Sequence, residues 1–387
     1  MVISPKVRGF ICTTAHPKGC KENIKNQIKY VKSKGKFKCP KNVLIIGAST
    51  GYGLASRISL SYGADANTLG IMFEKESSSK RTATAGYYNT KYFEEFAKKD
   101  GLYAETINGD AFSRKIKNEA IEKIKKDLGK IDLVIYSLAA PKRITEDGHV
   151  YSSTLKTIDK EFTNKSLDLR DNTINKVTIP VANKEEIEST VKVMGGEDWL
   201  LWLRALKDAD VLSNEAKTIA YSYIGPKLTY PIYYSGTIGM AKKNLCETCY
   251  KINNDLKDLN VKAYISVNKA LVTAASAAIP IVPLYISILY KVMKQKNLHE
   301  GCIEQMYRLY SNKFNNSNPS VNAGSLIRLD DYEMKEEVQN KVIENYNLIN
   351  TENIREYADI DGYYEDFYHM FGFNIDNVDY DEDILDF

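Results

Sequence analysis

The stretch Val43-Leu-Ile-Ile-Gly47-Ala-Ser-Thr-Gly51-Tyr-Gly53-Leu-Ala-Ser-Arg57 decides the fold. A short, apolar, β-branched run is followed by three glycines at the spacing G-x3-G-x-G, and helical apolar periodicity resumes after Gly53. This order of strand, tight turn and helix start is typical of the first βαβ unit of a dinucleotide-binding domain. Glycine is needed because a side chain would hold the backbone away from a pyrophosphate, which the free N–H groups of the helix start attract. An ordinary glycine turn is the alternative interpretation.

Length and composition indicate a globular protein. The chain has 387 residues, of which 43% are hydrophobic and 27% charged, enough for one large α/β domain or two smaller ones. No run approaches the roughly 18 apolar residues of a membrane span, and the first residues lack the apolar core of a signal peptide. We therefore expect a cytoplasmic protein. Six cysteines in so long a chain do not indicate a disulfide framework.

The net charge of +3 hides an asymmetry. Residues 351–387 contain 12 acidic side chains and one basic one, Arg355, so residues 1–350 carry a surplus of 14 positive charges. A basic body suits a polyanionic ligand such as a dinucleotide, coenzyme A or an acidic carrier protein. No Lys- or Arg-rich block supports nucleic acid, and we expect no nucleic-acid partner.

The next apolar run, residues 68–73, predicts a second parallel strand that ends in Glu74. Glu74 lies 21 residues after Gly53, where a carboxylate can accept hydrogen bonds from the adenosine ribose hydroxyls. Because it would also repel a 2′-phosphate, the sequence favours NADH over NADPH. Three nearby cations would partly offset the repulsion of a 2′-phosphate by Glu74: Lys75, Lys80 and Arg81.

Strands and helices continue to alternate. We expect helices over 88–99 and 115–128 and strands over 103–107 and 131–137, hence an open, doubly wound parallel sheet. Such sheets bind ligands beyond the carboxyl ends of their strands. Asp110-Ala111 and Leu138-Ala139 follow two strands and are predicted walls of the adenine and nicotinamide pockets, with plain loop starts as the alternative.

The pattern changes after residue 142. Residues 143–183 are polar and Thr-rich, which predicts a small β insertion over the sheet edge, a candidate substrate lid. Further on we expect a helix over 184–212 broken at Gly195-Gly196, strands over 218–224 and 261–267, a linker over 314–321 and a charged helix over 330–348. Trp199 and Trp202 are expected in the core or a pocket wall. The aromatic, acidic end should pack back on the body.

We expect one domain over 1–387 with internal divisions: a dinucleotide-binding half (41–142), the polar β insertion (143–183), a catalytic half (184–314) and a C-terminal helix with an acidic tail (315–387).

A nicotinamide site that reduces a C=C or C=O bond needs a proton donor, commonly a tyrosine with a lysine at Y-x3-K on one helix face. Tyr223-x3-Lys227 spans a Gly-Pro turn, and Tyr290-x3-Lys294 is expected at the surface beyond the last strand. Tyr233 and Lys242, nine residues apart, converge only if Tyr233 precedes a helix and Lys242 lies in its early turns. Gly236 and Gly239 allow that break, but among 27 tyrosines the spacing alone is weak support.

Several longer motifs resemble the trans-2-enoyl-CoA reductase / V-type enoyl-acyl-carrier-protein reductase family. The resemblance covers about residues 7–380 and rests on specific stretches: Ala15-His16-Pro17-x-Gly19-Cys20, Gly47-Ala-Ser-Thr-Gly-Tyr-Gly53, Tyr136-Ser-Leu-Ala139, Val193-Met-Gly-Gly-Glu-Asp-Trp199, Tyr221-Ser-Tyr223-Ile-Gly225-Pro226, Ile232-Tyr233-x2-Gly236-Thr-Ile-Gly239-x-Ala241-Lys242-Lys243 and Ser266-Val-Asn-Lys-Ala-Leu-Val-Thr273. It implies a monomeric, enlarged Rossmann fold of the short-chain-dehydrogenase type and NADH-dependent reduction of the α,β double bond of an enoyl thioester.

The resemblance also implies roles for particular residues. Tyr233 would be the proton donor, Lys242 the cofactor-binding lysine and Tyr223 a contact of the thioester carbonyl. The implied NADH contacts are Gly47, Ala48, Ser49, Thr50, Gly51, Tyr52, Phe73, Glu74, Asp110, Ala111, Leu138, Ala139, Lys242, Leu271, Val272 and Thr273. Hydride would go to Cβ, and Tyr233, with Tyr223, would stabilise the enolate that forms.

Other interpretations stay open. The favoured substrate is an enoyl-CoA such as crotonyl-CoA, in fatty-acid or butyrate-type metabolism, and the alternative is the enoyl-acyl-carrier-protein of fatty acid synthesis. A nucleotide-sensing regulator and a ketone or alcohol dehydrogenase are the other classes. Val282, Ile286 and Tyr290, at helical spacing, wall an acyl pocket or simply pack the core.

Metal and flavin sites are not expected. Cys246-x2-Cys249 has zinc or redox spacing, but no second C-x-x-C accompanies it, so we expect buried packing. We expect His16 and Cys20 to be structural. The family's C-terminal segment is described as flavin-binding, yet the sequence has no second glycine fingerprint and its acidic end would oppose a flavin pyrophosphate.

Overall fold

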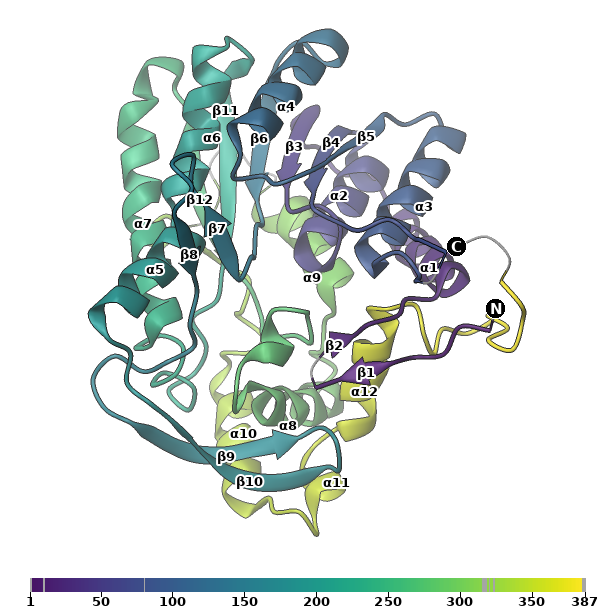
Figure 1. The fold of residues 1–387 in the computed structure, drawn as a ribbon, viewed down its shortest axis with the longest axis vertical. Coiled ribbons are helices and arrows are strands. Elements are labelled where there is room, and N and C mark those ends of the chain that lie inside the picture. Colours follow the sequence, from purple (N-terminus) through teal and green to yellow (C-terminus); the bar gives the residue numbers. More distant parts are fainter. Residues whose placement is uncertain are drawn as a thin grey trace.

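The computed structural model describes residues 2–9, 11–79, 81–314, 319, 321–322 and 324–384. Its centre is a seven-stranded sheet in the order β5-β4-β3-β6-β11-β12-β13, in which every neighbouring pair is parallel (Figure 1). These strands are β3 (Asn42–Ile46), β4 (Asn67–Met72), β5 (Ala104–Asn108), β6 (Ile131–Tyr136), β11 (Leu212–Ser222), β12 (Lys262–Val267) and β13 (Leu326–Arg328). The chain order reverses between β3 and β6, so the predicted doubly wound Rossmann sheet is confirmed.

Helices cover both faces of the sheet (Figure 1). The helices of the described residues are α1 (Pro17–Lys34), α2 (Gly51–Ala64), α3 (Ala85–Lys99), α4 (Arg114–Asp127), α5 (Lys184–Met194), α6 (Glu197–Asp208), α7 (Thr237–Asp255), α8 (Val282–Gln295), α9 (Cys302–Arg308), α10 (Glu336–Leu348), α11 (Ile354–Tyr357) and α12 (Ile360–His369). Short turns complete the set: η1 (Lys257–Leu259), η2 (Ser276–Ala278) and η3 (Leu309–Lys313).

Strand β3 shows how the sheet is buried. Val43 and Ile45 join one apolar core with residues of α1, α2 and α9, whereas Leu44 and Ile46 join another with residues of α4, α6 and α7. Successive side chains of a strand point to opposite faces, so a strand covered on both faces is a continuous apolar run. That accounts for the Val-Leu-Ile-Ile sequence before Gly47.

Both tryptophans pack in the core, as expected. Trp199 and Trp202 are fully buried on α6, and the Trp202 indole N–H donates to the Ala111 carbonyl at 3.1 Å. The same carbonyl accepts from the Lys117 ammonium at 2.8 Å, which also pairs with the buried Asp198 carboxylate at 2.8 Å. This buried ion pair fixes the loop that follows β5.

The polar insertion forms two antiparallel hairpins, β7–β8 (Lys142–Ile144 and Val150–Ser152) and β9–β10 (Phe162–Asp168 and Thr173–Ile179). The β structure is confirmed, but the position of the larger hairpin differs from the expectation. β9 packs on α8 (Figure 1). The Lys165 ammonium on β9 donates to the carbonyls of Tyr346 and Ile349, both at 2.9 Å. The hairpin is therefore attached to the C-terminal segment and not to the sheet edge.

Three expectations for the second half were wrong in detail. β12 is not the last strand, because β13 adds a seventh. The charged helix begins at Glu336, because residues 330 and 333 are buried in a turn. Tyr290 is fully buried, not at the surface, and its hydroxyl bonds to Asp366. The expected linker over 314–321 falls largely outside the described residues, as does Lys80.

The chain ends pack together, as expected for the aromatic C-terminus. A small hairpin, β1 (Val7–Arg8) and β2 (Ile11–Cys12), precedes α1. The buried His16 caps α1, accepting from the Gly19 amide at 3.1 Å, and its ring lies 4.8 Å from that of Tyr380. Within the described residues, no helix is both long and apolar enough to cross a membrane.

Candidate active site

The glycine loop after β3 has the geometry that its sequence predicts. Gly47 and Gly51 have positive φ angles of 87° and 53°, which favour glycine. A Cβ on Gly53 would lie 1.8 Å from the Gly47 carbonyl oxygen, so the helix start can approach the turn only without a side chain. A Cβ on Gly51 would meet nothing within 4 Å, and Thr50 places no side chain over the first N–H groups of α2. The loop thus presents open backbone donors, which fit a pyrophosphate.

Glu74 lies beside this loop, directly after β4. Its carboxylate accepts from the Ser49 hydroxyl at 2.6 Å, and its main chain is held by both amide atoms of Asn108 at 2.9 and 3.0 Å. Gly86 leaves the space that the carboxylate occupies, because a Cβ there would lie 2.1 Å from Oε1. The acidic group is therefore fixed next to the glycine loop.

The other residues predicted to contact the cofactor also follow strands. Phe73 comes directly after β4, Asp110-Ala111 after β5, Leu138-Ala139 after β6 and Leu271-Val272-Thr273 after β12. The carboxyl ends of parallel strands meet at one edge of the sheet, so these segments share the edge with the glycine loop. Tyr52, at the start of α2, connects the glycine loop to the chain that follows β12, since its hydroxyl donates to the Lys269 carbonyl at 2.6 Å.

Tyr233 and Lys242 meet the condition that the sequence sets for a convergent pair. Tyr233 lies in the turn before α7, and Lys242 lies in the second turn of that helix. A Cβ on Gly239 would lie 1.8 Å from the Tyr234 carbonyl oxygen and 2.5 Å from that of Tyr233. Glycine at 239 therefore lets the turn with Tyr233 fold back on the start of α7.

Burial shifts the pKa values of Tyr233 and Lys242 in opposite directions. Burial raises the pKa of Tyr233 well above its ordinary value, so its phenol keeps its proton and can donate it. Burial lowers the pKa of Lys242 to about 8. The Lys242 ammonium donates to the Tyr221 carbonyl at 3.1 Å, at the carboxyl end of β11.

Tyr223 follows β11 and stands against Tyr233, with ring centroids 4.9 Å apart and planes at 84°. Its hydroxyl bonds to Glu333 Oε1 at 3.0 Å. The same carboxyl oxygen accepts from the Tyr285 hydroxyl at 2.6 Å, and Oε2 accepts from the Ala270 amide at 2.8 Å. Two phenols thus stand side by side, and a buried carboxyl holds one of them.

Glu333 and Lys269 are the residues of this region that the sequence did not predict. Both are buried, and burial lowers the pKa of Lys269 to about 8. Glu333 lies in an acidic stretch that is typical of a solvated helix, and 110 residues separate it from Tyr223. Lys269 lies two residues after the end of β12, inside the Ser266–Thr273 motif, but nothing in that motif indicates that its side chain is buried.

The remaining candidates are wholly or partly buried. Val282, Ile286 and Tyr290 are buried on α8 in one apolar cluster with Leu271 and Val272. Cys249 is fully buried and Cys246 partly so. No group of three or more His, Cys, Asp or Glu in the described part of the chain could hold a metal ion.

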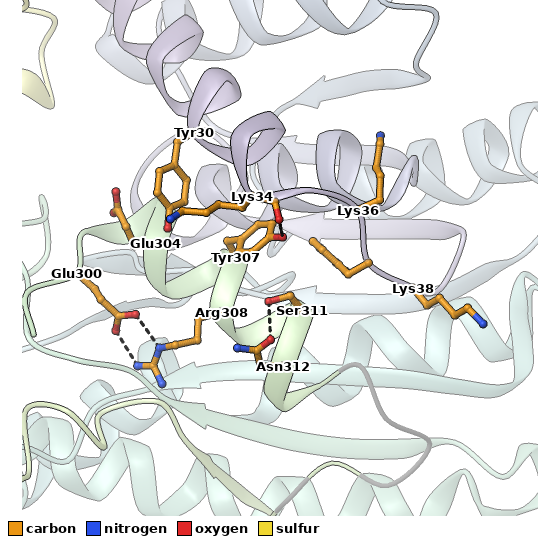
Figure 2. A pocket seen from close by; sticks show the side chains of 11 residues that line it. Tyr30, Lys34, Lys36, Lys38, Glu300, Glu304, Tyr307, Arg308, Ser311 and Asn312 are labelled. Atoms are coloured by element: carbon orange, nitrogen blue, oxygen red, sulfur yellow. Dashed lines mark hydrogen bonds and ion pairs between the residues drawn. The ribbon is translucent and has the colours of Figure 1, made fainter.

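A surface cavity of about 660 Å³ lies elsewhere, between the end of α1 and α9. Figure 2 shows Tyr30, Lys34 and Tyr307 on its wall and the Arg308–Glu300 ion pair, at 2.7 Å, beside them. None of its eleven lining residues is among those predicted to contact cofactor or substrate. The predicted chemistry therefore belongs to the strand ends and not to this cavity.

The arrangement at the sheet edge suits reduction by a nicotinamide dinucleotide. It combines an anion-accepting glycine loop, a fixed carboxylate for ribose hydroxyls, a lysine of lowered pKa and two phenols. A protonated phenol can hydrogen-bond to an oxygen that gains negative charge during the reaction.

Comparisons with known proteins agree over the whole chain. Residues 2–79 match the family model of the NAD(P)H binding domain of trans-2-enoyl-CoA reductase, residues 81–315 the trans-2-enoyl-CoA reductase catalytic region, and residues 321–384 the enoyl reductase FAD binding domain. A Clostridium perfringens (strain 13) protein named trans-2-enoyl-CoA reductase (NADH) is 55% identical over 99% of both chains. A Flavobacterium psychrophilum protein named enoyl-acyl-carrier-protein reductase (NADH) is 53% identical over 99% of this chain and 97% of its own.

Solved structures agree as well. The crystal structure of the Clostridium acetobutulicum trans-2-enoyl-CoA reductase in complex with NADH superposes with a TM-score of 0.97 at 45% identity, covering 99% of this chain and 98% of the other. The Treponema denticola trans-2-enoyl-CoA reductase in complex with NAD gives 0.96 at 44% identity, with the same coverage.

The third matched region does not fit a flavin. Its helix starts are closed to a pyrophosphate, because Asp359 caps the Gly362 amide at 3.0 Å and Glu336 and Glu337 occupy the first turn of α10. A Cβ on Gly372 would lie 2.5 Å from the Cys20 amide nitrogen, so that glycine packs against protein. We assign no step of the chemistry to a flavin.

Proposed function

Because the chain belongs to the trans-2-enoyl-CoA reductase family, we propose that it reduces the trans-2 double bond of an enoyl-CoA, such as crotonyl-CoA, with NADH. The observation that carries the proposal is the match to reductases of this kind over nearly the whole chain, at half or more of its positions. Reduction of the same bond in an enoyl-acyl-carrier-protein is the second candidate, because equally similar relatives have that name.

The residues at the sheet edge support a binding mode for NADH. We assign the pyrophosphate to the open backbone of the glycine loop and the adenosine ribose to Glu74. Lys242 binds the nicotinamide ribose, and the segments after β5, β6 and β12 wall the two base pockets. The assigned contacts are Gly47, Ala48, Ser49, Thr50, Gly51, Tyr52, Phe73, Glu74, Asp110, Ala111, Leu138, Ala139, Lys242, Leu271, Val272 and Thr273.

The mechanism follows from the two phenols. NADH, when bound, supplies a hydride to Cβ of the enoyl thioester. Negative charge then develops on the thioester oxygen, and Tyr233 and Tyr223 hydrogen-bond to it as it forms. Tyr233 is suited to give the proton because burial keeps it neutral. Protonation of the enolate completes the saturated acyl chain.

The thioester carrier is the first thing to test. We expect NADH oxidation with crotonyl-CoA to exceed that with crotonyl-acyl-carrier-protein at least about tenfold in kcat/KM, a difference of about 1.4 kcal/mol in transition-state binding. Spectrophotometric assays of both thioesters at matched concentrations measure it. The reverse ratio would make the carrier-protein thioester the substrate.

Two controls separate the other classes of function. NADH binding without oxidation by any enoyl thioester would indicate a nucleotide-sensing regulator. Activity on 3-ketoacyl but not on enoyl thioesters would indicate a ketone reductase.

Replacing Glu74 with alanine should weaken the preference for NADH. Electrostatic repulsion between a carboxylate and a 2′-phosphate about 4 Å away weakens NADPH binding by roughly 1–4 kcal/mol, depending on the local dielectric. We therefore expect kcat/KM with NADPH, relative to NADH, to rise about tenfold or more in Glu74→Ala. Glu76→Ala is the matched control, because Glu76 is exposed two residues further on. An unchanged ratio would contradict the assignment of Glu74 to the adenosine ribose.

We further propose a monomeric, cytoplasmic protein whose α8 face, with Val282, Ile286 and Tyr290, walls the acyl pocket. The divisions expected from the sequence, at 41–142, 143–183, 184–314 and 315–387, remain our proposal for its organisation. Light scattering on the purified protein measures its mass in solution and tests the monomer.

A further inference from the structure

Glu333 is a fully buried carboxyl group at the proposed substrate site. Its Oε1 lies 3.0 Å from the Tyr223 hydroxyl and 2.6 Å from the Tyr285 hydroxyl, and its Oε2 accepts the Ala270 amide at 2.8 Å. It belongs to the turn between β13 and α10, within the region matched by the FAD binding model. The C-terminal segment thus supplies the site with a carboxyl group.

The hydrogens in this cluster can be counted. Gln339 Nε2 donates to the Tyr285 hydroxyl oxygen at 3.2 Å, so the Tyr285 hydrogen points at Glu333 Oε1. If Glu333 is ionised, the single hydrogen of Tyr223 must also point at Oε1. Tyr223 would then offer only lone pairs to a thioester oxygen, which itself only accepts. An ionised Glu333 therefore conflicts with the contact proposed for Tyr223.

A neutral Glu333 removes the conflict. Its acid hydrogen on Oε1 can donate to the Tyr223 oxygen, which frees the Tyr223 hydrogen for the substrate. Oε2 keeps the bond from the Ala270 amide, which requires an acceptor. Every group then donates onward in one direction, from Gln339 through Tyr285, Glu333 and Tyr223 to the thioester.

We propose that Glu333 is a positioning residue, a neutral carboxylic acid that donates to the Tyr223 hydroxyl and so aims the Tyr223 hydrogen at the thioester oxygen. The inference rests on the proposed function, because it explains how Tyr223 can be a donor there. It gives the C-terminal segment a direct part in the reductase site.

The surroundings of Glu333 favour the acid form. Burial raises the pKa of Glu333 and outweighs the effects that lower it, which are the hydrogen bonds from Tyr285 and the Ala270 amide and the charge of Lys269; Asp330 raises the pKa further. The Lys269 ammonium is directed elsewhere: it donates to the Ala270 carbonyl at 3.0 Å and lies 4.9 Å from the Tyr290 ring centroid.

The other ionisable neighbours are also accounted for. Arg328 forms its ion pair with Asp330 at 2.6 Å and so does not neutralise Glu333. Burial holds both phenols that face the carboxyl group, Tyr223 and Tyr285, in their neutral form by raising their pKa. Among the described residues, no Lys, Arg or His side chain therefore forms an ion pair with Glu333.

Two substitutions of Glu333 distinguish a neutral carboxylic acid from an ionised carboxylate at this position. Glutamine imitates the acid, since its oxygen can accept from the Ala270 amide while its NH2 group donates to Tyr223. Methionine fills the volume but does neither. We expect Glu333→Met to lower kcat about 10- to 100-fold, the loss of one useful hydrogen bond of about 1.4–2.8 kcal/mol. Glu333→Gln should restore kcat to within about threefold of the wild type. Glu336→Gln, on the exposed first turn of α10, is the matched control.

Two further readouts exclude a merely structural role. In the Tyr223→Phe background, Glu333→Met should cost little further in kcat, because both substitutions remove the same contact. The wild-type kcat should fall at high pH, as Glu333 ionises above its raised pKa, and Glu333→Gln should lack that limb. NADH titration and thermal melting of each variant check cofactor binding and folding.

The inference is overturned if Glu333→Gln loses as much kcat as Glu333→Met while both fold and bind NADH. It is equally overturned if the cost of Glu333→Met is undiminished in Tyr223→Phe. Infrared spectroscopy of the ligand-free protein tests the acid separately from activity. The difference spectrum between the wild type and Glu333→Gln should contain the carbonyl band of a buried carboxylic acid, because other buried carboxyl groups, such as Asp198 and Asp330, contribute to both spectra. If that band is seen but no enoyl thioester oxidises NADH, the proposed function fails and the neutral acid stands. If thioesters are reduced but the band is missing, Glu333 is ionised and the inference fails alone.

Discussion

Tyr233→Phe is expected to lower kcat with crotonyl-CoA by about 100- to 10,000-fold, the range for removing a positioned proton donor. The phenylalanine ring keeps the packing against Tyr223, whose ring centroid lies 4.9 Å away, so only the hydroxyl is lost. Tyr233 is not assigned to the cofactor, so the Kd for NADH should stay within about threefold. Steady-state assays and fluorescence titration with NADH measure the two quantities.

The adjacent tyrosine provides the control for this substitution. Tyr234 is 56% exposed and packs on Tyr230, away from Tyr223. Tyr234→Phe should therefore leave turnover close to that of the wild type. Near-wild-type turnover of Tyr233→Phe would remove the residue from the chemistry, whereas a parallel loss of NADH binding would indicate a structural role.

The parts of the fold that the sequence predicts well are those with local signals. The run before Gly47 is apolar because β3 is covered on both faces, and Gly47 and Gly53 are glycines because a backbone atom occupies the place of each Cβ. The contact at Gly53 is local, with the Gly47 carbonyl, whereas a Cβ on Gly47 would meet the Ser137 carbonyl directly after β6. The glycine loop and the strands that follow it could be predicted from the sequence. Every predicted cofactor contact that is not on α2 or α7 lies at the end of a strand.

The proposed pairing of Tyr233 with Lys242 could be predicted only in part from the sequence. A spacing of nine residues fits opposite faces of one helix, so the pair needed a break between the two. Gly236 and Gly239 indicated the break, and the structure shows its cause in the close approach of the Tyr233 and Tyr234 carbonyls to Gly239. Gly236 and Gly239 make this turn possible, but the family resemblance was needed to choose Tyr233 among the 27 tyrosines.

Glu333 and Tyr290 show where sequence reasoning fails. Tyr290 was expected at the surface because it follows the last predicted strand, and Glu333 was not singled out because it lies in a predicted charged helix. Each is buried because a partner distant in the chain satisfies it, Tyr223 and Tyr285 for Glu333 and Asp366 for Tyr290. No local pattern encodes a contact across 76 or 110 residues. Burial of a polar group at the edge of a site is therefore information that only the assembled fold provides.

Lys242→Met should weaken NADH binding about 10- to 100-fold, because a hydrogen bond from a charged group is worth about 1.5–3 kcal/mol. Methionine keeps the length and most of the apolar volume of the lysine, so α7 should remain folded. Fluorescence titration gives the Kd and thermal melting checks the fold. Lys243→Met, one residue along on the exposed side of α7, is the matched control and should bind NADH normally.

The pH dependence of NADH binding distinguishes a charged contact of Lys242 from a packing role. Because burial lowers the pKa of Lys242 to about 8, the side chain is an ammonium below that pH and a neutral amine above it. The charged form binds the anionic cofactor better, so the wild-type Kd for NADH should rise as pH increases through about 8. The value of about 8 already includes the opposing effect of Cys246, one turn further along α7, which raises the pKa of Lys242. Lys269 also has a pKa of about 8, but it is retained in Lys242→Met. A rise that persists in Lys242→Met would therefore assign the titration to Lys269, whereas a flat profile would place the charge that binds NADH on Lys242.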